Sequence, residues 1–242
     1  MSMGRYYGSK QRIAKQLVKV ILDYMKDKEV EKVIDCFCGT GSVSWTLRKH
    51  IDVPIIASDH FEYMIITLKA LQSGWVPKKK ITHQQFNNLK LNTKHPLHSL
   101  VNIGCSWKGQ YLRDKYRNPW TNKMLTRLHK TVLNLDLKGI DFQVSDYRDY
   151  EYEKNCLIYC DPPYFTSNQK EWPKNYKGFD HVEFWDWVRK MSQNNIVLVS
   201  EFTAPDDFES IWEKNISVCD TRLDLIKTMH ENLWVIKKEQ PL

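Results

Sequence analysis

The chain has 242 residues, of which 42% are hydrophobic and 12% aromatic. These values exclude a disordered polymer and allow one α/β core that carries a modest insertion. The formal net charge of +7 favours an anionic partner. The positive excess lies in residues 78–138, where only Asp114 and Asp136 oppose a run of Lys and Arg side chains.

The predicted elements of the first part alternate between helix and strand. In chain order they are a helix over 13–24 capped by Ser9, a buried strand over 32–37, a glycine turn at 39–41, a helix over 43–47, a strand over 54–59 and a helix over 61–71. The second strand ends in a carboxylate. This order predicts the opening of a doubly wound parallel sheet.

The alternation stops at residues 75–138, which are basic, polar and rich in Asn, His and aromatic residues. We interpret this stretch as an insertion between the second and third core strands. The pattern then resumes with strands over 142–146, 156–161 and 196–200, helices over 182–191 and 206–212, and a terminal strand over 233–236 that pairs with a strand near Val218. The predicted division is a core of residues 1–74 and 139–242 and an insertion of residues 75–138.

The six cysteines show no C-x-x-C pair and no spacing typical of secreted proteins, which predicts reduced thiols. The first ten residues hold no apolar segment, and no stretch reaches the length of a membrane span. We therefore expect a cytoplasmic protein with no membrane contact. No Cys or His set has the spacing of a metal site, which predicts that no metal is bound.

The motif Asp161-Pro162-Pro163-Tyr164 directly follows an apolar run, residues 156–160. Two consecutive prolines end a strand, and ligands bind at the carboxyl ends of parallel strands. Asp161 and the Pro162 carbonyl can each accept a hydrogen bond from a planar amine, and Tyr164 can stack on a base. The alternative is a proline turn with an N-capping Asp. Cys160 is expected to be a core residue and not a nucleophile.

A second motif, Asp35-Cys36-Phe37-Cys38-Gly39-Thr40-Gly41, lies at the end of the first strand. Its glycines allow a tight turn and a close backbone approach to a ligand. A dinucleotide-binding fingerprint would have a third glycine where Ser44 stands, which disfavours a nicotinamide oxidoreductase. Asp59 ends the second strand, where a helix cap is the alternative to a binding role.

Together these motifs, in this order, resemble the Dam-like N6-adenine-specific DNA methyltransferases, the D-P-P-Y class found in phages and restriction-modification systems. The resemblance implies an α/β fold, the Rossmann-like sheet of S-adenosylmethionine-dependent methyltransferases, with helices on both faces and an inserted, mostly helical target-recognition region. It implies site-specific methyl transfer from S-adenosylmethionine to N6 of a flipped adenine in double-stranded DNA, with no covalent enzyme–base intermediate. The short chain predicts a stand-alone enzyme that requires no protein partner. Cys36 departs from the family pattern, which often has proline there.

The resemblance also assigns residues to roles. The catalytic residues are Asp161, Pro162 and Tyr164, and the DNA-binding residues are Lys108, Arg113, Lys115 and Arg117. The cofactor-binding residues are Tyr6, Lys10, Asp35, Phe37, Gly39, Gly41, Asp59, Asp146 and Asp161, with Asp59 on the ribose hydroxyls and Asp146 on the adenine of the donor. Residues 165–179 form either a lid ordered by DNA or an ordinary surface loop. For Lys10 and for the basic segment, the alternative is a solvated cationic surface.

Two alternatives to the predicted function remain, a methyltransferase with another substrate and a catalytically inactive form. RNA adenine, cytosine N4 and protein amides are methylated by related families, but those more often carry Asn or Ser ahead of Pro-Pro-Tyr, so Asp161 favours DNA adenine. A catalytically inactive DNA-binding partner subunit is disfavoured because Asp161, Tyr164, Gly39 and Gly41 are all present.

Overall fold

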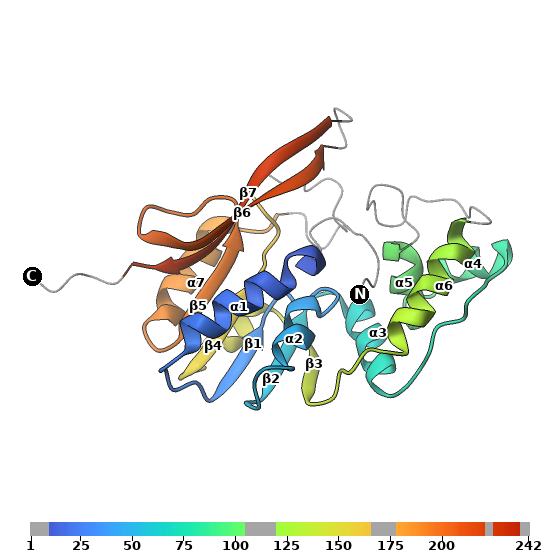
Figure 1. The fold of residues 1–242 in the computed structure, drawn as a ribbon, viewed down its shortest axis with the longest axis horizontal. Coiled ribbons are helices and arrows are strands. Elements are labelled where there is room, and N and C mark those ends of the chain that lie inside the picture. Colours follow the sequence, from blue (N-terminus) through green and yellow to red (C-terminus); the bar gives the residue numbers. More distant parts are fainter. Residues whose placement is uncertain (1–9, 105–119, 166–177, 221–224, 238–242) are drawn as a thin grey trace, which may run out of the picture.

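The computed structural model describes residues 10–104, 120–165, 178–220 and 225–237, which form one seven-stranded sheet flanked by helices (Figure 1). The strands are β1 (Lys32–Asp35), β2 (Ile55–Asp59), β3 (Ile140–Val144), β4 (Cys156–Cys160), β5 (Ile196–Glu201), β6 (Phe208–Asp220) and β7 (Leu225–Ile236). The helices are α1 (Ala14–Met25), α2 (Ser42–Leu47), α3 (Glu62–Gln72), α4 (His83–Leu91), α5 (Leu97–Gly104), α6 (Trp120–Val132) and α7 (His181–Ser192), with 3-10 turns at Lys10–Arg12 and Tyr147–Tyr150.

The sheet has the order β3-β2-β1-β4-β5-β7-β6. Strands β1 to β5 pair in parallel, whereas β7 runs antiparallel to both β5 and β6. The chain builds outward from β1 to β3, then returns to the other side of β1 with β4 and β5. The strand order therefore reverses between β1 and β4, which is where doubly wound sheets bind ligands.

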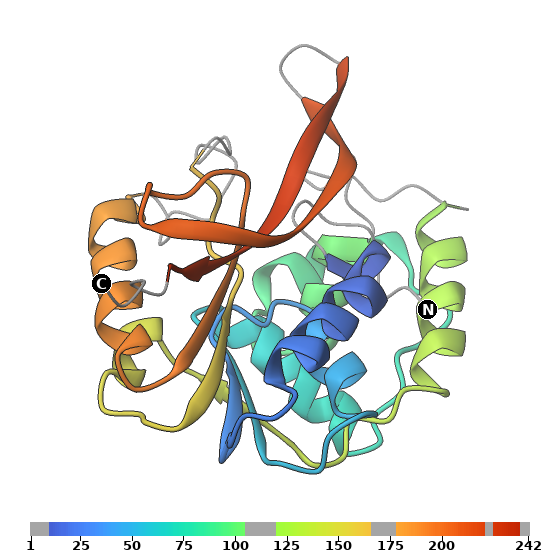
Figure 2. The same cartoon turned by 60° about the vertical axis from the view of Figure 1, so that its left-hand side comes forward.

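Both faces of the sheet are buried, as a parallel sheet requires. Adjacent residues of β1 belong to different apolar clusters, since Val33 packs with α1 to α3 and Ile34 packs with α7. Figure 2 shows α7 on one side of the sheet and α1 to α3 on the other. The predicted doubly wound core, with helices on both faces, is confirmed.

The insertion is mostly helical, as expected, and it extends the core beyond α3 (Figure 1). Phe86 of α4 and Leu125 of α6 belong to the same apolar cluster as α1 and α3. Two side chains join α3 to the insertion: Ser99 donates to the Tyr63 carbonyl at 2.6 Å, and Thr67 donates to the Pro96 carbonyl at 2.8 Å. Burial and hydrogen bonding thus hold the described part of the insertion on α3.

Two predictions about local structure are wrong. The stretch 206–212, expected to be a helix, instead starts the strand β6 at Phe208. Its apolar residues Phe208, Ile211 and Trp212 have helical spacing, but pairing with β7 decides the conformation, with an irregularity between Ser210 and Trp212. The first helix is not capped at the predicted position: α1 begins at Ala14 after a 3-10 turn, with Ile13 as N-cap.

The long hairpin β6–β7 was expected only as a short pair near Val218 and 233–236. In the structure it runs over the full length of both strands and projects beyond the sheet (Figure 2). The predicted hairpin is present, but its register differs: Leu233 pairs with Trp212, and Val218 pairs with Lys227. Within the described ranges, every helix is too short or too polar to cross a membrane.

Candidate active site and family

Acidic residues stand at the carboxyl ends of four parallel strands. Asp35 ends β1, Asp59 ends β2, Glu201 ends β5, and Asp161 directly follows β4. The register pairs Asp35 with Tyr159, two residues before Asp161. These side chains consequently meet at one edge of the sheet, on both sides of the point where the strand order reverses.

The glycine turn between β1 and α2 is tied to β2 by Asp59. Gly39 and Gly41 have φ values of 50° and 68°, a region that disfavours residues with a Cβ atom. The Gly39 and Phe61 amides donate to Asp59 Oδ2 and Oδ1, each at 2.9 Å. Burial raises the pKa of Asp59 to about 6, although these two hydrogen bonds oppose the rise. Asp59 therefore fixes the shape of the turn through its carboxylate.

Asp35 presents an unsatisfied oxygen beside this turn. Its carboxylate is 2% exposed, and Oδ2 accepts a hydrogen bond from the Ser44 hydroxyl. Oδ1 is buried and has no hydrogen-bond partner among the described residues. Burial raises the pKa of Asp35 to about 7; the Ser44 hydrogen bond opposes this, and the charges of Asp161 and Asp59 add to it. A buried acceptor of this kind suits a cationic or hydrogen-bond-donating ligand group.

The Asp-Pro-Pro-Tyr motif forms a rigid corner after β4, with Pro162 and Pro163 buried. Asp161 Oδ1 accepts a hydrogen bond from Lys10 Nζ at 2.7 Å. Burial raises the pKa of Asp161 to about 6; Lys10 opposes this rise, and the charge of Glu231 contributes to it. The corner therefore holds a carboxylate that is more basic than a solvated one.

Lys10 is buried inside this network. Only 7% of the residue is exposed, and its ammonium lies 3.2 Å from Glu231 Oε1 in addition to its contact with Asp161. Burial lowers the pKa of Lys10, but the charges and hydrogen bonds of Asp161 and Glu231 outweigh it, so the net direction is upward. The alternative of a solvated lysine at a helix start is excluded.

Tyr164 is held at both its hydroxyl and its ring. The hydroxyl donates to Glu231 Oε1 and also contacts Lys10 Nζ. The ring packs edge-on against Phe202, with 4.6 Å between ring centroids. Burial raises the pKa of Tyr164 well above its ordinary value, and the charges of Asp161 and Glu231 add to the effect. The phenol stays protonated and acts as a donor.

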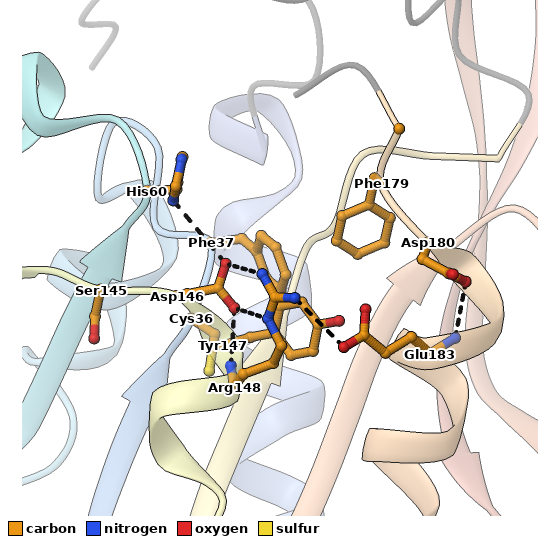
Figure 3. Close-up of a pocket in the computed structure, with 11 residues that line it drawn as sticks. Cys36, Phe37, His60, Ser145, Asp146, Tyr147, Arg148, Phe179, Asp180 and Glu183 are labelled. Carbon is orange, nitrogen blue, oxygen red and sulfur yellow. Dashed lines mark hydrogen bonds and ion pairs between the residues drawn. The ribbon is translucent and has the colours of Figure 1, made fainter. Parts of the chain in front are cut away.

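A pocket opens beside the glycine turn, between the ends of β1, β2 and β3 and the start of α7 (Figure 3). Its lining consists of Cys36, Phe37, His60, Ser145, Asp146, Tyr147, Arg148, Gly178, Phe179, Asp180 and Glu183. Arg148 donates to both oxygens of Asp146, from Nε at 2.7 Å and Nη2 at 3.0 Å, and its Nη1 lies 3.4 Å from Glu183. Partial burial raises the pKa of Asp146, but Arg148 outweighs it and leaves the pKa below its ordinary value.

The sequence matches the family model of the D12 class N6 adenine-specific DNA methyltransferases over residues 6–97 and 109–215. The chain belongs to this family. The match contains the glycine turn, Asp59 and the Asp-Pro-Pro-Tyr corner, and it ends before β7. The left-handed glycine turn and the unpartnered Asp35 oxygen fit the methyl donor of such an enzyme, S-adenosylmethionine, which carries a sulfonium and an ammonium group.

A curated relative is the Type II methyltransferase M.FokI of Planomicrobium okeanokoites, with 22% identity over 211 residues. The match covers 74% of this chain and 31% of that protein, so the chain spans about a third of the length of this relative. Among solved structures, a putative RNA methyltransferase from Pyrococcus horikoshii is similar with a TM-score of 0.44 and 9% identity, over 93% of this chain and 81% of that chain. A SAM-dependent O-methyltransferase from Thermotoga maritima is similar with a TM-score of 0.42 and 10% identity, over 94% of this chain and 67% of that chain.

The structure brings most of the predicted residues of this D12 methyltransferase together. Lys10, Asp35, Gly39, Gly41, Asp59, Asp161, Pro162 and Tyr164 lie at the strand ends, and Phe37 and Asp146 line the adjoining pocket. Tyr6, Lys108, Arg113, Lys115, Arg117 and residues 166–177 lie outside the described residues. Cys160 is buried, which confirms it as a core residue, and Phe184, Trp185 and Trp187 of α7 are buried as well.

The residues of the site that were not predicted include Arg148, Glu201 and Glu231. Glu201 ends an apolar strand as Asp59 does, so its position was a usable signal. Glu231 had none, because its partner Tyr164 is 67 residues away in the sequence. In the parts of the chain that the structure describes, no group of three or more acidic, Cys or His side chains could hold a metal ion.

Proposed function

We propose that the protein transfers a methyl group from S-adenosylmethionine to the N6 amino group of a flipped adenine in double-stranded DNA. The observation that carries this proposal is the rigid Asp161-Pro162-Pro163-Tyr164 corner, whose buried carboxylate lies at the same strand edge as the glycine turn and Asp35. S-adenosylmethionine supplies an electrophilic methyl group on sulfur.

On the donor side, the carboxylate of Asp35 binds a positively charged group through its unpartnered Oδ1. Asp59 shapes the Gly39 turn and offers further lone pairs to the ribose hydroxyls. Phe37 and Asp146 line the pocket that receives the adenine ring. We also assign Tyr6, which lies outside the described residues, to donor binding from its sequence motif alone.

On the acceptor side, Asp161 and the Pro162 carbonyl accept hydrogen bonds from the amino group of the target base. These bonds orient the nitrogen lone pair toward the methyl group, and they strengthen as the nitrogen becomes cationic. Tyr164 stacks on the extruded base, since its ring is fixed by Glu231 and Phe202. The proton lost from nitrogen passes to the Asp161 carboxylate.

The insertion, residues 75–138, serves as the target-recognition region in this proposal. Its cations neutralise phosphates, and we assign DNA contacts to Lys108, Arg113, Lys115 and Arg117 from their interleaving with aromatic residues. The described part of the insertion packs on α3 through α5, and α3 follows β2, the strand that ends in Asp59. We further propose that the enzyme acts in the cytoplasm and needs no protein partner.

The test uses cells that express the protein, or its Asp161→Asn variant, in a host without adenine methylation. We expect methylated adenine within one short recognition sequence, and a loss of at least about 100-fold in the variant because the acceptor of the amino proton is gone. Asp206→Asn, an exposed change of the same chemistry, should leave methylation intact.

Purified protein with labelled S-adenosylmethionine and matched duplex DNA, single-stranded DNA and RNA separates the alternatives. Transfer to RNA or to cytosine N4, with none to duplex adenine, would overturn the proposal. Donor binding without transfer to any nucleic acid would favour an inactive partner subunit.

A further inference from the structure

Glu231 is a buried carboxylate on β7 that contacts the two side chains facing Asp161. It is 1% exposed, it lies 3.2 Å from Lys10 Nζ, and it accepts a hydrogen bond from the Tyr164 hydroxyl. β7 is the antiparallel strand next to β5, and Glu231 lies beyond the residues that match the family. The contact joins the outer hairpin to the Asp-Pro-Pro-Tyr corner.

Burying a carboxylate is costly unless it is paired and hydrogen bonded. Both conditions hold for Glu231, which shows that its position in the network is built rather than incidental. Lys10 lies closer to Asp161, at 2.7 Å, than to Glu231, at 3.2 Å, so one ammonium serves two carboxylates. Neither carboxylate is fully neutralised.

We propose that Glu231 is a positioning residue: its carboxylate anchors the Tyr164 hydroxyl and shares the Lys10 ammonium with Asp161, which fixes the Tyr164 ring and keeps Asp161 a strong acceptor. This inference rests on the proposed function for its catalytic consequence. The anchoring itself concerns only residues of this chain.

The sign of the electrostatic effect follows from the groups around Asp161. Lys10 faces it from the turn before α1, Tyr159 and Tyr164 from β4 and the corner after it, Asp35 from β1, Glu201 from β5 and Glu231 from β7. The negative charge of Glu231 raises the pKa of Asp161. Without that charge, Lys10 pairs with Asp161 alone, the pKa of Asp161 falls, and its carboxylate becomes a weaker acceptor.

The first measurement needs no activity. Protein labelled with ¹³C at the tyrosine ring carbon that bears the hydroxyl is compared by NMR as wild type, Glu231→Gln and Glu213→Gln. Tyr164→Phe identifies the Tyr164 resonance by its disappearance. We expect this resonance to move in Glu231→Gln and to stay in place in Glu213→Gln, which removes an exposed carboxylate from the same hairpin. An unmoved resonance in folded Glu231→Gln overturns the anchoring.

The second measurement is methyl transfer to duplex DNA as a function of pH. In Glu231→Gln we expect kcat to fall about 10- to 100-fold through misplacement of the ring, with little change in KM for the donor. The acidic limb of the plot of kcat against pH should shift to lower pH by about one unit. Glu231→Asp keeps the charge, so its acidic limb should stay near that of the wild type. If kcat falls in Glu231→Gln but the acidic limb does not shift, the proposed electrostatic effect of Glu231 on Asp161 is wrong.

The two proposals fail separately. If the wild type methylates no adenine but the Tyr164 resonance responds to Glu231→Gln, the proposed function is wrong and the anchoring stands. If the wild type is active and Glu231→Gln matches it in kcat and in pH profile, the positioning role is wrong and the function stands.

Discussion

Two ionic clusters at the same edge of the sheet differ in their exposure to water. In the pocket of Figure 3, Arg148 and Glu183 are 56% and 49% exposed, whereas Lys10 and Glu231 beside the Asp-Pro-Pro-Tyr corner are 7% and 1% exposed. Exposed ion pairs are worth about 0–1 kcal/mol and are screened by salt. Buried pairs are costly to break, because each partner left behind is an uncompensated charge.

Because of this difference in exposure, we expect the two clusters to respond to different conditions, one to salt and ligand and the other to pH. The exposed pairs around Asp146 can open when a ligand enters, and salt should modulate them. In the network around Asp161, Lys10 and Glu231 are buried and the Asp161 side chain is only 15% exposed. Salt should therefore affect this network less than protonation does. Under the proposed function, the pocket that receives the donor would therefore respond to salt, and the site of methyl transfer would respond to pH.

The variant Asp35→Asn, between the two clusters, should have the largest effect and tests whether this side of the site binds the donor. The variant keeps the shape of the side chain but removes the charge that faces the donor. We expect S-adenosylmethionine to bind roughly 10- to 100-fold more weakly, the range for a charge-assisted hydrogen bond. Isothermal titration calorimetry measures this loss.

The same variant should be more stable than wild type at pH 8, because the pKa of Asp35 is raised to about 7 and its charged form is costly in the fold. This part of the stability is present at low pH and is lost as pH rises through about 7. Weaker binding together with lower stability at pH 8 would contradict the role of Asp35 and indicate a structural defect.

The pH dependence of transfer sharpens the comparison for the buried network. The pKa of Asp161 is raised to about 6, mainly by burial. Its carboxylate accepts protons only when ionised, so kcat should fall about tenfold for each pH unit below 6. Steady-state rates between pH 4.5 and 8.5 check this limb.

Glu201→Gln provides the control for that limb. The pKa of Glu201 is raised to about 8 by burial, so this side chain is neutral where Asp161 titrates. Its amide replacement should leave the limb near pH 6 unchanged. If the decrease in kcat at low pH shifts in Glu201→Gln, the titrating group is Glu201 of β5 and not Asp161.

The smallest expected effect is at the exposed cluster. Arg148→Gln releases Asp146, and donor affinity should rise by up to about fivefold, because the lost ion pair is worth about 0–1 kcal/mol. Raising the salt concentration should reduce the difference between this variant and wild type. A weaker affinity in the variant would show that Arg148 itself binds the donor.

Arg189→Gln is the matched control for Arg148→Gln. Arg189 donates to both oxygens of Asp207 at 2.6 and 2.9 Å, and it is not among the residues that line the pocket. Its removal should leave donor affinity unchanged.

Several elements were predictable because the sequence carries a strong local signal for them. The apolar run before Asp161 and the strand before the glycine turn became β4 and β1 within about two residues. Residues 206–212 failed because their apolar spacing is helical while their conformation depends on pairing with β7. Lys10 was predicted to bind the donor, but its burial between Asp161 and Glu231 could not be foreseen from a helix start.

Periodicity, prolines and glycines act on their immediate neighbours, so the doubly wound sheet, the glycine turn and the acidic corner after β4 could all be predicted from the residues alone. The sharing of partners between charges could not: Glu231 contacts Tyr164 and Lys10, and Arg148 contacts Asp146 and Glu183, only once the chain has folded. The strength of those interactions depends on distance and burial in the folded chain, which local residue spacing does not encode.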